Sequence, residues 1–207
     1  MSEAPIEIGH VELTEEPPEE PSRPRSRLRL IVLSAVLVVA VAGAAVLAWS
    51  AYQIASQKDA KLTAPAQIGS LRLDDSDDGR STADYLQTAL AAEVDLDQAV
   101  GAVYRDGSGK NVLFFGGTTL FWTPESDLHT AFGLISDNEG AVTDLHEVPA
   151  GKLGGTAKCG TTKSEDGDLA VCGWADHGSL ALAMFPSRPV SEAAPLLIQI
   201  REAAETR

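Results

Sequence analysis

The two cysteines of this 207-residue chain, Cys159 and Cys172, have the spacing of a bridged hairpin. Each lies in a stretch of strand-forming residues, and the two stretches flank a turn around Glu165 and Asp166. A hairpin folded there places the cysteines directly opposite each other, close enough for a disulfide. A redox-active pair usually has Cys-x-x-Cys spacing and a zinc site needs more than two thiols, so we predict a structural disulfide.

Three histidines, His129, His146 and His177, are the candidates for acid–base chemistry. A serine nucleophile would need one of them as its base, and a third group to orient that base. No serine has a Gly-x-Ser-x-Gly context, and the Gly-Ser-Gly segment at 107–109 has the composition of a turn rather than of a strand-to-helix elbow. The sequence therefore predicts no enzyme active site.

The acidic segment 74–79 resembles the start of a calcium loop, because side-chain oxygens at its first, third and fifth positions precede a glycine. Its twelfth position is Tyr85, where a calcium loop requires a bidentate glutamate. The Gly-Lys pair at 109–110 lacks the Ser or Thr that follows in a phosphate loop. We interpret 74–79 and 164–168 as solvated turns, with a loose cation site as the alternative, and predict no metal or cofactor.

Trp174 and His177 are the candidate partner-binding residues. Trp174 shares a strand with Cys172 and lies across from Ala157 and Ala181, whose small side chains leave room for a large ring. Large aromatic side chains are mostly buried, which favours a packing role. If the ring instead faces water beside the disulfide, Trp174 would anchor a partner, with His177 in the adjacent turn.

Far upstream, Leu30 to Tyr52 form a run of 23 residues without a charge. A helix needs roughly 20 apolar residues to cross the hydrocarbon core of a bilayer. Buried core helices and signal peptides usually have shorter apolar runs, although 48–50 and 55–56 resemble weak cleavage sites. We predict an uncleaved transmembrane helix at 30–52 with the lipid bilayer as its partner, after a disordered, acidic and proline-rich cytoplasmic tail at 1–29.

The charges beside this span indicate its orientation. Four arginines precede it and two lysines follow it: Arg23, Arg25, Arg27, Arg29, Lys58 and Lys61. This bias predicts a cytoplasmic N-terminus at the plasma membrane, a linker at 53–66 and an extracytoplasmic domain at 67–207. An oxidising exterior would allow the disulfide to persist.

The chain is acidic, with a formal charge of −14. From Lys58 onward, 23 Asp and Glu stand against 12 Lys and Arg. Such a surface repels phosphate backbones, so we exclude nucleic acid as a partner. The acidity otherwise serves to keep an exported domain soluble.

The exported domain alternates short strands with helices. Alternating residues and turn signals predict strands at 70–74, 100–104, 111–115, 142–148, 156–162, 169–175 and 179–184. Apolar residues at helical spacing predict helices at 82–94 after a Ser81 cap, from Pro124 after a Thr123 cap, and at 191–205. The sequence predicts an α+β fold, in which one transmembrane helix precedes a mostly antiparallel sheet with helices packed on one face.

The segments Ala157-Lys-Cys-Gly160 and Ala170-Val-Cys-Gly-Trp-Ala-Asp-His-Gly-Ser179, with the closing helix, resemble an uncharacterised family of actinobacterial single-pass membrane proteins. The acidic leader and single span are similar to theirs as well. The resemblance implies a location and a small extracytoplasmic domain, and it supplies no functional residue.

These patterns favour a membrane protein whose outer domain binds an envelope protein or a small ligand. The alternative is an envelope hydrolase that uses His177 or His146 with Asp176 or Asp144 nearby. A third hypothesis makes the tail a signalling element, phosphorylated beside the arginines. Its candidate sites are Thr14, Ser22 and Ser26.

Overall fold

The computed structural model describes residues 25–135, 141–164 and 167–207. Its first helix, α1 (Arg25–Gln57), is apolar and long enough to cross a membrane over Arg29–Gln57, and its most apolar stretch has no buried residue. The prediction of one helix that is apolar and long enough to span a membrane is confirmed, although α1 extends beyond 30–52 at both ends. Residues 1–24 of the predicted tail, including Thr14 and Ser22, lie outside the described residues, so the signalling hypothesis stays a prediction.

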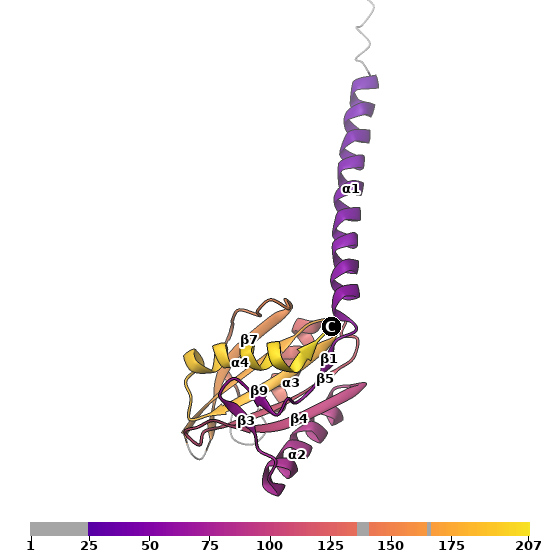
Figure 1. The fold of residues 1–207 in the computed structure, drawn as a ribbon. Coiled ribbons are helices and arrows are strands. Elements are labelled where there is room, and N and C mark those ends of the chain that lie inside the picture. Colours follow the sequence, from indigo (N-terminus) through magenta and orange to yellow (C-terminus); the bar gives the residue numbers. More distant parts are fainter. Residues whose placement is uncertain (1–24, 136–140, 165–166) are drawn as a thin grey trace, which may run out of the picture. The chain divides into compact units, whose positions relative to one another are not determined.

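An antiparallel sheet of eight strands forms the centre of the domain, in the order β2-β3-β4-β5-β9-β8-β7-β6 (Figure 1). The bounds are β2 Gln67–Ile68, β3 Leu71–Leu73, β4 Gln98–Arg105, β5 Asn111–Thr118, β6 Thr143–Glu147, β7 Thr156–Ser164, β8 Gly167–Ala175 and β9 Ser179–Pro186. A second, two-stranded sheet pairs β1 (Lys61–Leu62) with β10 (Glu205–Thr206). The predicted α+β class with a mostly antiparallel sheet is confirmed.

Helices cover both faces of this sheet rather than the single face that the sequence suggested. α4 (Val190–Ala204) packs on the face that carries Cys172 and Trp174. α2 (Asp77–Glu93) and α3 (Pro124–Leu134) pack on the opposite face with Val171 and Leu182. The physical reason is that β8 and β9 are apolar on both sides, so each side must be shielded from water.

The cysteine hairpin has the predicted register, with Cys159 opposite Cys172 in β7 and β8. The two are joined by a disulfide with an S–S distance of 2.02 Å, and both are fully buried. The predicted turn residues Glu165 and Asp166 lie outside the described residues. The structural disulfide is confirmed.

The segment that was predicted to be a linker, 53–66, is instead part of the folded domain. Gln57, at the end of α1, is only 4 % exposed, and Leu62 packs in the core. The backbone N–H of Thr63 donates to the Ala204 carbonyl oxygen at 2.9 Å. The polar composition of this segment suggested a linker, but β1 within it pairs with the C-terminal strand β10, and the Leu62 side chain packs in the core.

The start of α2 also differs from the prediction. The helix begins at Asp77 and is capped by Ser76, whose hydroxyl accepts a hydrogen bond from the Gly79 N–H at 3.1 Å. Ser81, the predicted cap, lies inside the helix. Ser76 is the better cap because two aspartates follow it in the first turn, where the helix dipole favours negative charge.

Candidate functional site

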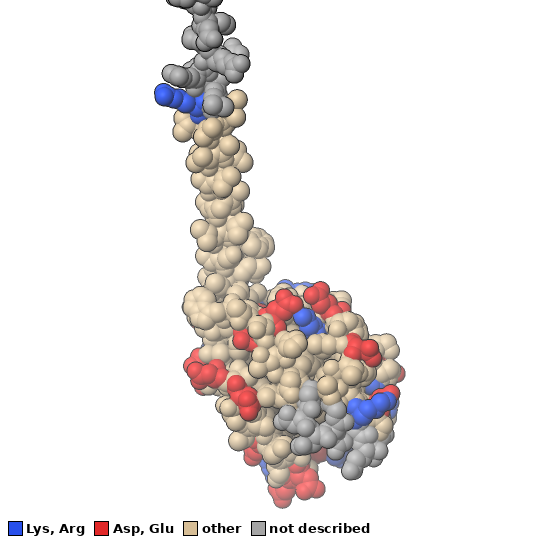
Figure 2. All heavy atoms as spheres, turned by 180° about the vertical axis from the view of Figure 1, so that it is seen from behind, with Lys and Arg blue, Asp and Glu red and all other residues tan. Residues whose placement is uncertain are grey.

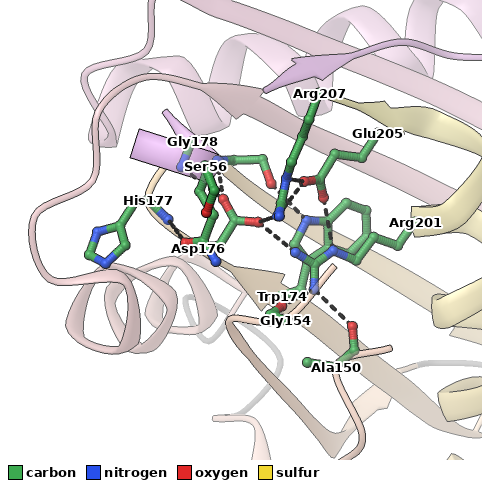
Figure 3. A network of polar contacts seen from close by, with 12 residues as sticks. Ser56, Ala150, Gly154, Trp174, Asp176, His177, Gly178, Arg201, Glu205 and Arg207 are labelled. Atoms are coloured by element: carbon green, nitrogen blue, oxygen red, sulfur yellow. Dashed lines mark hydrogen bonds and ion pairs between the residues drawn. The ribbon is translucent and has the colours of Figure 1, made fainter. Parts of the chain in front are cut away.

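Polar groups converge at the tight turn between β8 and β9 (Figure 3). Asp176 begins this turn, and its Oδ1 accepts hydrogen bonds from the backbone N–H groups of Gly178 at 2.7 Å and Ser179 at 2.9 Å. Aspartate suits this place because its short side chain reaches backbone N–H groups two residues further along the chain. The second carboxylate oxygen, Oδ2, is left to face helix α4.

Asp176 forms a cluster with three other charged side chains, of which Arg201 and Glu205 are buried and Arg207 is 21 % exposed. We call Asp176, Arg201, Glu205 and Arg207 the ion cluster (Figure 3). Arg201 Nη2 lies 2.5 Å from Asp176 Oδ2, and Arg207 Nη2 donates to the same atom. Arg201 Nε donates to Glu205 Oε2 at 2.8 Å, and Arg207 Nε donates to Glu205 Oε1 at 3.0 Å. Two carboxylates therefore meet two guanidinium groups.

Arg201 is the centre of the ion cluster, with a side chain that is 1 % exposed. Its Nη1 donates to the carbonyl oxygens of Ala150 at 2.9 Å and Gly154 at 2.6 Å. Its guanidinium carbon lies 5.4 Å from the centre of the Trp174 ring, within the range of a cation–π contact. All three of its nitrogens have acceptors, as a buried charge requires.

Burial shifts the protonation equilibrium of Asp176. Burial, followed by the nearby Glu205 carboxylate, raises the pKa of Asp176 above its ordinary value. The Gly178 N–H, Arg201 and Arg207 act in the opposite direction. Because its groups bind one another, the ion cluster joins α4 and the C-terminal strand to the β8–β9 turn, and its role is structural.

Trp174 is fully buried, so the hypothesis that it anchors a partner at the surface is wrong. Its ring stacks on Phe114 with 5.9 Å between centroids, and its indole N–H donates to the Ser179 hydroxyl at 3.0 Å. Ala157 and Ala181 lie opposite it, as predicted. The packing role is the one that the structure supports.

His177 is half-buried and links the turn to two other segments. Its backbone N–H donates to Gln57 Oε1 at 3.1 Å, at the end of α1. Its Nδ1 lies 2.8 Å from the Phe121 carbonyl oxygen, which can only accept, so this nitrogen donates. The next residue, Gly178, has no room for a side chain, because a Cβ would lie 1.8 Å from the Gln57 carbonyl oxygen. His177 therefore holds three segments together.

The structure does not assemble the histidine–carboxylate pairs of the hydrolase hypothesis. The carboxylate of Asp176 faces the arginines, whereas the His177 ring points away from them (Figure 3). His146 Nδ1 lies 2.7 Å from the backbone carbonyl oxygen of Asp144, not from its carboxylate. Among the residues that the structure describes, no carboxylate is hydrogen-bonded to either imidazole, as the orienting group of a general base usually is.

Two adjoining hollows lie at the start of α3, and they share Pro124 and Glu125. The larger has a volume of about 590 Å³ and is lined by Thr123, Pro124, Glu125, Ser126, His129, Thr130 and Lys158. The smaller, of about 310 Å³, is lined by Gln53, Gln57, Pro124, Glu125, Gly155, Thr156, Asp176 and His177. We call the larger one the α3 hollow, and it places His129 beside hydroxyl and charged groups.

One ion pair fixes the charge distribution of the α3 hollow. Lys158 Nζ, on β7, donates to Glu125 Oε1 at 2.7 Å. This hydrogen bond and the charge of Lys158 lower the pKa of Glu125, so Glu125 is ionised at neutral pH. A polar ligand would meet one carboxylate, one ammonium and three hydroxyl groups here.

The loop before α3 exposes two large apolar side chains that the sequence analysis missed. Trp122 is 71 % exposed and Leu120 is 38 % exposed, and we call these two residues the apolar tip. Phe121, between them, is buried. The sequence did contain a signal for this exposure. Leu-Phe-Trp at 120–122 follows the end of a strand, where the alternation of apolar and polar residues no longer places each side chain in the core.

In the acidic segment 74–79, both carboxylate oxygens of Asp74 contact other groups of the protein. Asp74 Oδ1 accepts from the Ser76 N–H at 3.2 Å, and Asp74 Oδ2 binds Arg105 at 2.7 Å. Hydrogen bonds from Ser76, and after them Arg105, lower the pKa of Asp74. Among the described residues no three His, Cys, Asp or Glu side chains gather as metal ligands would. The second acidic turn, 164–168, is described only in part.

Acidic side chains are more frequent than basic ones on the face of the domain that Figure 2 shows, in line with the composition. Comparison of the chain with models of protein families, with curated proteins and with solved structures found no match. The resemblance to actinobacterial membrane proteins stays a prediction.

Proposed function

We propose that this chain is a single-pass protein of the plasma membrane that presents a binding domain outside the cytoplasm. The observation that carries the proposal is α1, whose run from Leu30 to Tyr52 has no charge and leaves its large apolar side chains exposed. A helix in water would bury such a surface against a partner element, whereas a bilayer solvates it.

The basic residues beside the uncharged run of α1 support an orientation. Four arginines precede the uncharged run, and Lys58 and Lys61 follow it. Lys58 is paired with Asp59 at 2.9 Å, but acidic residues have little influence on the orientation of a span. The positive-inside rule therefore supports a cytoplasmic N-terminus and an outer domain.

The disulfide gives independent support for an outer domain. Cys159 and Cys172 are the two cysteines of the chain, and they are bonded to each other. Disulfides form and persist outside the reducing cytosol. A domain folded in the cytosol would retain two free thiols in the middle of its core.

A topology reporter tests this arrangement. Alkaline phosphatase fused after Arg207 should be active in whole cells, and a cytosol-dependent fluorescent protein fused there should stay dark. Replacement of the four upstream arginines by glutamine should weaken the orientation and reduce phosphatase activity. A phosphatase fusion that is inactive, beside a bright fluorescent fusion, would refute the proposal.

Binding is the activity that the surface of the domain supports best. The α3 hollow offers hydroxyl, imidazole, ammonium and carboxylate groups on a rigid helix start, which suits a polar envelope ligand or a polar segment of an envelope protein. His129 is exposed in this lining and accepts substitution without disturbing the core. The α3 hollow is the candidate binding surface.

In-cell crosslinking tests the binding role. A photoreactive amino acid at His129 should give a discrete crosslinked product after illumination of intact cells. The same amino acid at Tyr85, another exposed helix position, on α2, serves as the matched control. Equal labelling at the two positions would mean that the α3 hollow binds nothing specific.

A further inference from the structure

The apolar tip lies in an unusually neutral part of an acidic domain. Residues 111–124 contain no Asp, Glu, Lys, Arg or His, although the domain as a whole is strongly acidic. Trp122 and Leu120 protrude from this stretch, exposed by 71 % and 38 %. Exposed apolar residues of this kind mark a contact surface, and the absence of charge removes the cost of taking charges out of water.

The tip is attached to the end of α1 by a short chain of hydrogen bonds. The Phe121 N–H donates to the His177 carbonyl oxygen at 3.1 Å, and His177 Nδ1 donates back to the Phe121 carbonyl oxygen at 2.8 Å. The His177 N–H binds Gln57 Oε1 at 3.1 Å. Because Phe121 lies between the two tip residues, the tip is fixed to the last turn of α1.

The same end of the domain reaches back along α1 toward the apolar run. Pro124, two residues after Trp122, lines the smaller hollow together with Gln53 and Gln57. Gln53 directly follows Tyr52, and both Gln53 and Ile54 are half-buried against the domain. At about 1.5 Å per residue, even Gln57 lies only about 8 Å beyond Tyr52.

Trp49 and Tyr52 mark where the apolar run meets the headgroup layer. Both rings are exposed, by 64 % and 66 %, and aromatic rings of this kind concentrate at membrane interfaces. The headgroup layer is about 6 Å thick on each side of the hydrocarbon core. A segment that reaches the level of Gln53 therefore lies within or directly beside this layer.

We propose that the apolar tip, Leu120 and Trp122, inserts into the headgroup layer of the same bilayer that α1 crosses. This inference rests on the proposed membrane anchor. The occupant is lipid because Phe121, between the two tip residues, is linked through His177 to Gln57 of α1, next to that layer. With α1 and the tip as two contacts, the domain lies on the membrane surface and holds the α3 hollow beside the headgroups.

Tryptophan fluorescence of the full-length chain in lipid nanodiscs tests the insertion. The variant Trp49→Phe leaves Trp122 and the fully buried Trp174 as emitters. Lipids brominated near the headgroup end of their chains should remove the Trp122 emission, and aqueous acrylamide should not. The further substitution Trp122→Phe should abolish the quenching by brominated lipid.

An exposed aromatic residue elsewhere on the domain provides the control. In a chain with Trp49→Phe, Trp122→Phe and Tyr85→Trp, the new tryptophan on α2 should be quenched by acrylamide and not by brominated lipid. This result would show that proximity to a nanodisc alone does not cause quenching.

The remaining outcomes overturn the inference in distinguishable ways. If Trp122 is quenched by acrylamide and not by brominated lipid, the tip is in water. If neither quencher acts, protein covers the tip. In both cases the anchor proposal stands, provided that the chain resists alkaline carbonate extraction. If carbonate extracts the chain from membranes, the anchor proposal fails and the inference fails with it.

Discussion

In two hairpin turns of this domain an aspartate accepts hydrogen bonds from backbone N–H groups and binds arginine, but the pKa of the aspartate is shifted in opposite directions. Asp106, between β4 and β5, accepts hydrogen bonds from the Ser108 N–H at 2.8 Å and the Lys110 N–H at 3.0 Å. Its other oxygen binds Arg188 at 2.6 Å. Asp176, between β8 and β9, likewise accepts from two backbone N–H groups and binds arginine.

The surroundings of the two aspartates differ. The Asp106 side chain is 15 % exposed, and the Ser108 hydroxyl, followed by Arg188, lowers its pKa well below the usual range. The Asp176 side chain is fully buried beside a second carboxylate, and its pKa is raised. Desolvation thus decides the sign of the shift even where the hydrogen bonds are alike.

The largest expected effect comes from the substitution Arg201→Ala. It leaves the Asp176 and Glu205 carboxylates buried with one arginine fewer, and unfolding free energy should fall by about 4 kcal/mol. Chemical denaturation of the purified chain measures this loss. The control is Arg80→Ala, which removes an exposed pair with Asp77 and should cost less than about 0.5 kcal/mol. Equal losses would mean that burial does not distinguish the two kinds of ion pair.

Removal of the disulfide should have the next largest effect. The double substitution Cys159→Ala and Cys172→Ala opens a short loop, with an expected loss of about 3 kcal/mol in the chain-entropy account. The bridge joins β7 to β8, and β8 ends directly before Asp176, so hydrogen exchange should rise in β7 and β8 more than around Asp106. A uniform rise over both hairpins would contradict this difference between the two turns.

The two aspartates should respond to pH in opposite directions. Because the folded pKa of Asp106 is lowered, its carboxylate stabilises the fold above about pH 4, and this stabilisation is lost as pH falls further. The destabilisation caused by Asp106→Asn should therefore disappear in acid. Because the folded pKa of Asp176 is raised, the stabilisation that it provides is present in acid and is lost as pH rises through that pKa.

Thermal unfolding at a series of pH values measures both slopes. The melting-temperature deficit of Asp106→Asn should shrink as pH falls, whereas that of Asp176→Asn should shrink as pH rises. If both deficits changed with pH in the same direction, the pKa values of the two aspartates would be shifted in the same direction, and the difference between the two turns would be refuted.

The smallest expected effect on stability is that of Trp122→Ser. The ring is largely exposed, so its removal should change the unfolding free energy of the detergent-solubilised chain by no more than about 0.5 kcal/mol. Trp174→Ser, by contrast, removes a buried ring and should cost about 4 kcal/mol. A large loss for Trp122→Ser would mean that the tip belongs to the core.

The disulfide could be predicted from the sequence because the information is local. The positions of Cys159 and Cys172 relative to one turn are enough to set their pairing. The same local reasoning correctly placed Ala157 and Ala181 across from Trp174. It gave helices on one face only, because the side on which a helix packs depends on long-range connections.

The ion cluster could not be predicted, because its members come together only through the path of α4. Arg201 and Glu205 are four residues apart on one helix, and this pair is visible in the sequence. Nothing local indicates that Asp176 would face them from another element. Trp122 was missed for a related reason, since a loop residue has no periodicity from which its exposure can be inferred.

The complete burial of the disulfide has a consequence for how long its oxidation state lasts. Both sulfur-bearing side chains lie beneath α4 with no exposed surface, so a soluble reductant meets them only after the domain opens. The oxidation state of the two cysteines is therefore set when the domain folds, and it persists for as long as the domain stays folded. Counting the free thiols of the denatured protein would show whether the chain folded in an oxidising or a reducing compartment.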